Sequence, residues 1–197
     1  MGEKGDATKQ RIIESACKLF HSQGYHRTGI EDILKASKVK KGSFYFHFKN
    51  KEALGYAVID RYTVKAAIPL IQPLRSDGEP LDKIVALFQR QGRALKISGY
   101  KGGCPFGLLA NELSDHHPGF RLKLDAVFDS WSREVQAVLN KAQKEGKMRK
   151  SIDAEAMSRF IIALLEGSAL LAKTKKKSVV YQDCVKSLRL LLESLKI

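Results

Sequence analysis

The chain has 197 residues, an ordinary apolar content of 44% and a formal net charge of +14. Its length suits one domain, or a small domain joined to a larger one, and its apolar content argues against a disordered chain. The charge predicts a polyanionic partner, either nucleic acid or an anionic membrane surface, although high charge also keeps soluble proteins apart. Charge alone does not choose among these interpretations.

The cysteines and the apolar runs indicate the compartment. The chain has an odd number of cysteines, Cys17, Cys104 and Cys184, and no CxxC motif. Neither a disulfide framework nor a cysteine zinc site is therefore expected. Met1–Arg11 is charged and lacks the apolar core of a signal peptide. No apolar run approaches the roughly 20 residues that span a bilayer. The sequence therefore predicts a cytoplasmic protein in a reducing compartment, with no membrane partner.

Apolar residues recur at helical spacing along the whole chain and strand alternation is almost absent, which predicts an all-α fold. A first helix is expected from about Thr8 to Gln23, with Gly24 as its stop. Thr28–Glu31 has the form of a capping box and opens a second helix. A short aromatic segment, Gly42–Phe48, follows after a tight turn. Asn50 then has the place of an N-cap for a long helix.

Proline, glycine and aspartate also mark the expected helix ends in the second part of the chain. Pro80 and Pro118 are placed as first-turn prolines, and Asp153 is placed as an N-cap. The helix from Phe160 to Ala172 is apolar on almost all sides, which is typical of a buried helix. The last helix has a wide apolar face. We expect about nine helices in two domains, a small basic three-helix domain over residues 1–54 and a larger helical domain over residues 55–197.

The segment Thr28–Lys51 has the helix-turn-helix pattern, since two helices flank a tight turn and the second helix is short. A helix in the major groove needs small or polar residues toward the bases and cations toward the phosphates. Gly42 and Ser43 are small, and Tyr45 and His47 can hydrogen-bond phosphate oxygens. Lysines crowd around this short helix at Lys38, Lys40, Lys41, Lys49 and Lys51. The pattern predicts binding to double-stranded DNA; the alternative is a solvated lysine-rich face beside a small aromatic core.

The stretch ASKVKKGSFYFHFKNKEAL, from Ala36 to Leu54, resembles the signature of the tetracycline-repressor family (TetR or AcrR type). In that signature a Gly-x-aromatic-Tyr-x-x-Phe recognition helix leads into Lys-Glu-x-Leu. Arg11–Phe20 and Gly24-Tyr25 also match the family's first helix, so the resemblance covers roughly Thr8 to Val58. It implies a homodimeric repressor that binds palindromic operator DNA and is released by a small-molecule effector. Residues 1–54 would then be the helix-turn-helix DNA-binding domain, and residues 55–197 the ligand-binding and dimerisation domain. Activation instead of repression stays open, and neither catalysis nor a cofactor is expected.

The resemblance also implies roles for individual residues. Positions near the bases are Gly42, Ser43 and Phe44, and positions that contact phosphate are Thr28, Tyr45, His47 and Lys51, while Lys40 and Lys41 can contact either. Phe44 has an equal second interpretation, as a wedge in the core of the small domain.

A dimer is expected because one helix-turn-helix contacts few base pairs, and two copies about one helical turn apart gain affinity and specificity. The wide apolar faces of the last two helices predict the interface, as the resemblance also implies; the alternative is that they fill the core of the monomer. The resemblance places an effector pocket in the larger domain. Its expected lining residues are Phe88, Cys104, Phe106, Leu109, Phe128, Trp131 and Phe160, each of which can instead be plain core.

Cys104 supports an alternative function. Gly102–Gly107, followed by Asn111–Leu113, resembles a segment found in a subgroup of the family that includes electrophile- and oxidant-sensing repressors. A cysteine just before a helix start can have a depressed pKa, because the helix dipole favours the thiolate. The other interpretation is a small buried residue in a tight turn. The adjacent His116 and His117 have no second ligand cluster, so no metal site is expected.

Overall fold

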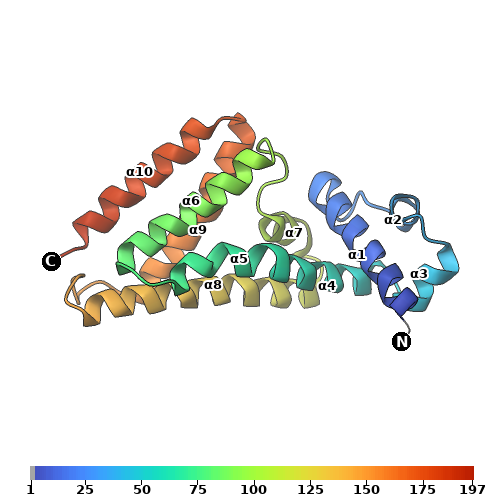
Figure 1. The fold of residues 1–197 in the computed structure, drawn as a ribbon, viewed down its shortest axis with the longest axis horizontal. Coiled ribbons are helices and arrows are strands. Elements are labelled where there is room, and N and C mark those ends of the chain that lie inside the picture. The colour runs from blue at the N-terminus through green and yellow to red at the C-terminus, as the bar shows by residue number, and fades with distance from the viewer. Residues whose placement is uncertain (1–2) are drawn as a thin grey trace. The chain divides into compact units, whose positions relative to one another are not determined.

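The structure is a computed structural model that describes the backbone of residues 3–197 and the side chains from residue 5 onward. The helices are α1 (Glu3–Gln23), α2 (Ile30–Ser37), α3 (Lys41–His47), α4 (Lys51–Tyr62), the π-helical η1 (Thr63–Ala67), α5 (Ile68–Ile71), the 3-10 helix η2 (Gln72–Arg75), α6 (Pro80–Ile97), α7 (Pro105–Leu113), α8 (Pro118–Lys144), α9 (Ala154–Lys175) and α10 (Ser178–Ser194). Since α4, η1, α5 and η2 continue one another without a gap, residues 3–197 hold nine continuous helical segments (Figure 1). The predicted all-α fold of about nine helices is confirmed.

The chain folds as two compact units that do not follow chain order. The first unit comprises the residues up to Ala66 together with Pro105–Leu124, and the second comprises Ala67–Cys104 together with Asp125–Ile197. The first unit therefore takes α7 and the first turns of α8, in addition to the helices that precede residue 67. The domain boundary expected between residues 54 and 55 stays a prediction.

In the first unit, α1 packs against α2, α3 and α4 around a small apolar core. Ile12, Phe20, Ile33 and Leu54 are fully buried there, or nearly so. The predicted N-cap at Asn50 is present, because its side chain accepts the N–H of Ala53 at 2.8 Å. These short helices are thus held by core packing and by capped ends.

The predicted capping box at Thr28 is wrong by one residue. The N-cap of α2 is Gly29, whose N–H is accepted by the carboxylate of Asp32 at 2.8 Å. The hydroxyl of Thr28 instead donates to the carbonyl of Gly24 at 2.7 Å. Gly24 ends α1 with a φ of +90°. Thr28 is therefore used to close the turn after α1, which leaves the glutamate at position 31 without its expected role.

In the second unit, α6, α9 and α10 lie side by side (Figure 1). The hydroxyl of Tyr181 on α10 lies 2.7 Å from the carbonyl of Phe88 and 2.9 Å from Oε1 of Gln91, both on α6. Gly92 faces this ring, and a Cβ at that position would lie 2.8 Å from Cε1 of Tyr181. The absence of a side chain at residue 92 therefore lets α10 approach α6 closely.

The predicted helix starts of this part of the chain are confirmed. Pro80 is the first residue of α6, and Pro118 is the first residue of α8. The carboxylate of Asp153 accepts the N–H groups of Glu155 and Ala156 at 2.9 and 3.1 Å, and so caps α9. Across the part of the chain that the structure describes, no helix has both the length and the apolar character needed to cross a bilayer.

Candidate nucleic-acid interface

Helix α3 has one buried face and one open face. Phe44 is completely buried, whereas Lys41, Gly42, Ser43, Tyr45 and Phe46 are exposed. An ideal Cβ built on Gly42 meets nothing within 4 Å, so the first turn of the open face is unobstructed. A small first turn is what a helix needs for close approach to base edges in the major groove.

The turn between α2 and α3 is fixed by a backbone hydrogen bond and by a buried side chain. Lys38 adopts a left-handed conformation with a φ of 54°, and its N–H bonds back to the last turn of α2. The next residue, Val39, is buried. The turn is therefore packed against the unit, which fixes the direction in which α3 leaves it.

Burial favours the core interpretation of Phe44 over contact with bases. Its ring lies 5.3 Å from the ring of Tyr45 and 5.9 Å from that of Phe48, which is also buried. A fully enclosed side chain cannot reach a base pair without unfolding the helix. Phe44 and Phe48 instead seat α3 on the first unit, so that the opposite face stays outward.

Phe46 is a residue of this surface that sequence reasoning missed. Its side chain is 75% exposed, and that of Tyr45 is 47% exposed. Residue 46 follows Gly42 and Ser43 by four and three positions, so all three share one face of α3. This spacing was the available signal, but position 46 is a variable position of the motif. Such an exposed aromatic ring beside two small residues is suited to apolar contact with a thymine methyl group.

Thr28 and Lys51 make internal contacts. Thr28 is fully buried, and Nζ of Lys51 donates to the carbonyls of Tyr25 and Thr28, both at 3.0 Å. The same ammonium lies 4.3 Å from the centroid of the Tyr25 ring, and burial lowers the pKa of Lys51. Lys51 thus ties the first turn of α4 to the loop after α1. Phosphate contact by these two residues stays a prediction.

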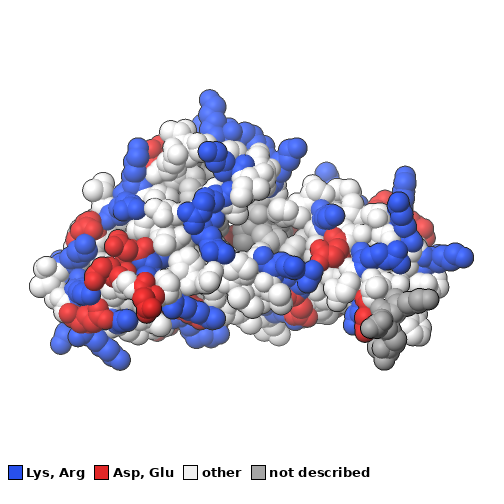
Figure 2. All heavy atoms as spheres, in the orientation of Figure 1, with Lys and Arg blue, Asp and Glu red and all other residues white. Residues whose placement is uncertain are grey.

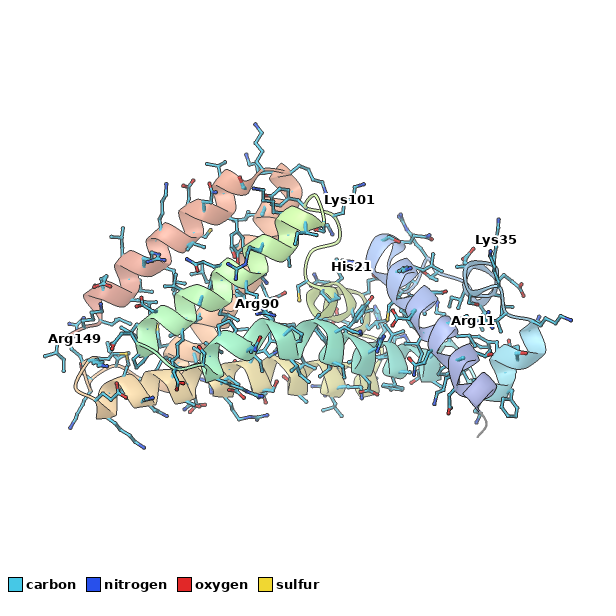
Figure 3. The ribbon with its side chains drawn as sticks, viewed as in Figure 1. Arg11, His21, Lys35, Arg90, Lys101 and Arg149 are labelled. Carbon is cyan, nitrogen blue, oxygen red and sulfur yellow. The ribbon has the colours of Figure 1, made fainter. Side chains whose placement is uncertain are left out.

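The rim of this surface is basic and solvent-exposed. Exposed lysines surround α3 at Lys35, Lys38, Lys40, Lys41 and Lys49. Lys35 points away from α1 (Figure 3), and Lys41 has only a loose, exposed ion pair with Glu31 at 3.6 Å. His47 adds a partly buried ring whose Nδ1 has no hydrogen-bond partner. Exposed cations around a small-residue helix face suit phosphate contacts, which dominate the affinity of DNA-binding proteins.

Comparison with known proteins decides the family. Residues 12–58 match the family described as bacterial regulatory proteins, tetR family. Residues 80–188 match the family described as tetracyclin repressor-like, C-terminal domain, and this match alone covers more than half of the chain. The chain belongs to the TetR family.

Its relatives are transcriptional regulators. The transcriptional regulator AcuR of Cereibacter sphaeroides is 31% identical over 166 residues, which are 83% of this chain and 75% of AcuR. The transcriptional repressor DhaR of a Mycobacterium species is 27% identical over 168 residues, 85% of this chain and 83% of DhaR. A solved TetR regulator from Chloroflexus aurantiacus superposes with a TM-score of 0.89 at 28% identity, over 99% of this chain and 98% of the other. These similarities support DNA-binding transcriptional regulation by this TetR-family chain.

The seven expected pocket residues are divided between the two units. Phe106 and Leu109 lie in the first unit, and the other five lie in the second. Phe88, Phe106, Leu109 and Trp131 are buried, and Cys104 and Phe128 are half-buried. Phe160 is 51% exposed on α9, so it is not an enclosed lining residue of this TetR protomer. The pocket as a whole stays a prediction.

Cys104 and the histidine pair have defined neighbours. The thiol of Cys104 hydrogen-bonds to the carboxylate of Glu166, whose pKa is raised by burial. The ring of His117 packs at 6.4 Å from Tyr25 and 5.7 Å from Phe120, within the first unit. Among the side chains that the structure describes, from residue 5 onward, no three His, Cys, Asp or Glu side chains come together as a metal site.

Proposed function

We propose that this chain is a homodimeric repressor that binds palindromic operator DNA through α2 and α3, and that a small-molecule effector in the larger domain releases it. The observation that carries the proposal is the open face of α3, with Gly42, Ser43 and Phe46 outward and Phe44 buried beneath. Lys40 and Lys41 flank the first turn of this helix, where phosphates pass beside a major-groove helix.

The dimer interface in this proposal is the outer face of α9 and α10. Large apolar side chains are at least half exposed there in the single chain: Phe160, Leu170 and Leu171 on α9, and Val179 and Leu190 on α10. Leaving such side chains in water is unfavourable by about 25 cal/mol per Å² of apolar surface. A second copy of the chain would cover them, as TetR-family proteins dimerise.

Effector release follows from a difference in affinity between two dimer states. An effector that binds more tightly when the two α3 helices no longer match successive major grooves shifts the population away from the DNA-bound state. The similarity to the repressor DhaR supports repression as the direction of control.

The binding test uses fluorescence anisotropy with the intergenic DNA upstream of the protein's own gene, over a series of salt concentrations. We expect sequence-selective binding whose affinity falls steeply with salt. The Lys40→Gln/Lys41→Gln variant should bind more weakly, with a salt slope flatter by roughly one unit for each lost phosphate contact. Lys144→Gln/Lys150→Gln, which removes the same charge from the second unit, is the matched control. Equal slopes for both double variants would refute the assignment of α3.

The interface test is the mass of the chain by light scattering at micromolar concentration. Leu171→Glu on α9 places a charge in the proposed interface and should convert the dimer into a monomer, because an unpaired charge is costly to bury. Asn140→Glu on α8 adds the same charge at an exposed polar position outside α9 and α10, and should leave the dimer intact. A wild-type chain that is strictly monomeric would overturn the proposed interface.

A second candidate function is thiol-based sensing through Cys104, supported by the similarity to the repressor NemR of Escherichia coli, which is 27% identical over 174 residues. In this reading the sulfur of Cys104 adds to the C=C bond of an electrophile and the thiol proton passes to the adjacent carbon. N-ethylmaleimide should then abolish operator binding by the wild type and spare Cys104→Ser. Intact operator binding by protein alkylated at Cys104 would remove this candidate.

A further inference from the structure

A hollow of about 740 Å³ lies between α6 and α10, within the second unit. Its lining includes Arg93 and Lys96 from α6, Tyr100 from the loop after α6, and Tyr181, Val185 and Lys186 from α10. The volume falls in the range of about 300–1,000 Å³ that is typical of small-molecule sites. None of these residues belongs to the DNA-binding surface or to the expected effector pocket.

All charged residues that line this hollow are basic. Its lining residues include Arg93, Lys96 and Lys186 but no aspartate or glutamate. Across the described part of the chain, Arg93 and Lys96 have no carboxylate within ion-pair distance, and Lys186 has only the exposed Asp183 at 3.8 Å. Arg93 and Lys96 are three residues apart on one helix, so they are neighbours on its surface. Cations gathered in a concave site without counter-charge create a local field that attracts anions.

Further basic residues lie around this hollow and add to its positive electrostatic field. The lysine-rich segment Lys173–Lys177 forms the connection between α9 and α10. Nζ of Lys176 donates to the carbonyl of Tyr100 at 2.7 Å, which brings this segment to the rim of the hollow. Lys101 follows in the same loop (Figure 3). Figure 2 shows basic side chains over the C-terminal half of α6 and this segment, whereas acidic side chains gather toward the N-terminal end of α6.

The hollow also has an apolar component. Tyr181 is fixed by its hydroxyl contacts to α6 and closes against Gly92, so the ring forms a rigid wall. The side chains of Tyr100 and Val185 are half-buried beside it. Tyr100 has a φ of 59°, an uncommon conformation for a residue with a side chain, and Lys176 holds its carbonyl. Rigid rings beside cations favour a flat organic anion over an inorganic ion.

We propose that the hollow between α6 and α10 binds a small organic anion of nucleotide size, with a flat apolar part and two or more negative charges. The anionic groups lie against Arg93 and Lys96 on α6, and the flat part lies against Tyr100 and Val185. Arginine supplies paired donors that match phosphate or carboxylate oxygens. This site is separate from the proposed effector pocket and does not depend on operator binding.

The test is isothermal titration of the full chain with ADP, and with adenosine as its uncharged counterpart. We expect wild type to bind ADP and not adenosine, and Arg93→Gln/Lys96→Gln to bind ADP at least roughly tenfold more weakly, since two charge-assisted contacts are lost. Lys144→Gln/Lys150→Gln is the matched control, because it removes two charges from another lysine-bearing hollow of the same unit. Both pairs of side chains are exposed, so circular dichroism should show folded variants.

Three results would overturn the proposal. If wild type does not bind ADP, the hollow does not bind an organic anion of nucleotide size and the proposal fails. Equal weakening by both double variants means that affinity follows net charge and not this hollow. Unchanged affinity in Arg93→Gln/Lys96→Gln places the anion elsewhere. Operator affinity measured without ADP should be the same in wild type and Arg93→Gln/Lys96→Gln, so failure here is distinguishable from failure of the proposed repressor function.

Discussion

The carboxylate of Glu112 on α7 accepts the backbone N–H of His26, at 3.0 Å, and Nε2 of His26 lies 3.1 Å from the carbonyl of Glu112. The same carboxylate accepts the N–H of Tyr25 at 3.2 Å. A Cβ at Gly24 would lie 2.5 Å from Oε1 of Glu112, so a glycine is needed for this approach. A helix distant in sequence is thereby fixed to the loop that leads from α1 into the helix-turn-helix.

Replacement of Glu112 by alanine should lower the free energy of unfolding by about 1–3 kcal/mol, because two backbone amides lose a charged acceptor. The measurement is the urea midpoint by circular dichroism. Asp115→Asn is the control, since Asp115 is exposed and the described residues include no hydrogen-bond partner for it. Operator affinity should fall in Glu112→Ala as well, because the loop before α2 is no longer held. Equal midpoints for the two variants would show that the contact carries no stability.

The local elements of this fold are predictable from short sequence patterns, whereas its long-range contacts are not. The helix starts at Asn50, Pro80 and Asp153 can be predicted from the sequence, because a cap or a first-turn proline acts within three residues of its own position. The contact of Glu112 with His26 joins residues 86 apart, and a single sequence holds no signal for that pairing.

In the candidate site too, local features are predictable from the sequence, whereas contacts between distant residues are not. Thr28 has the sequence pattern of a helix N-cap. In the structure its hydroxyl instead hydrogen-bonds to the carbonyl of Gly24 in the turn after α1. Phe44 and Phe46 are identical residues two positions apart, and only the direction of α3 decides that one is buried and the other exposed. Lys51 was predictable as a cation but not as a donor to two carbonyls, since those carbonyls lie in another loop.

Phe44 and Phe46 should therefore respond in opposite ways to substitution. Phe44→Ala empties a fully buried site and should cost about 3–5 kcal/mol of stability. Phe46→Ala should leave the unfolding midpoint almost unchanged and weaken operator binding, mainly at thymine-containing positions of the site. Thermal unfolding and anisotropy with single-base operator variants check both statements. A Phe46→Ala protein with wild-type affinity for every operator variant would exclude Phe46 from base contact.

Lys51 should prove to be a stabilising residue of the first unit. Lys51→Met keeps much of the aliphatic stem but removes the ammonium, which leaves the carbonyls of Tyr25 and Thr28 without their donor. We expect a loss of about 1–3 kcal/mol in thermal or urea unfolding. Lys49→Met, at an exposed position, is the control and should change stability little. If Lys51 acts only on phosphate, its variant will instead keep full stability and show a flatter salt dependence of operator binding.

Glu166 should give the second unit a pH-dependent stability. Its Oε1 is buried without a hydrogen-bond partner, and burial raises the pKa of Glu166 above 4.5, opposed by the hydrogen bond from Cys104. Between 4.5 and the raised native value, the unfolded chain binds fewer protons at this residue than the native chain. The contribution of Glu166 to stability is therefore full below pH 4.5, falls as the pH rises through the native pKa, and is constant above it.

Glu166→Gln removes this titration at nearly constant volume. Relative to wild type, the variant should gain stability as the pH rises from about 4.5, and the difference should then level off once Glu166 is ionised in the native chain. Urea unfolding of both proteins between pH 4 and 8 measures that difference. Asp129→Asn, at an exposed position of α8, should show no such rise. A stability difference that is flat or decreasing over this interval would mean that the native chain accommodates the ionised carboxylate without cost, and that Glu166 has a polar partner beyond Cys104.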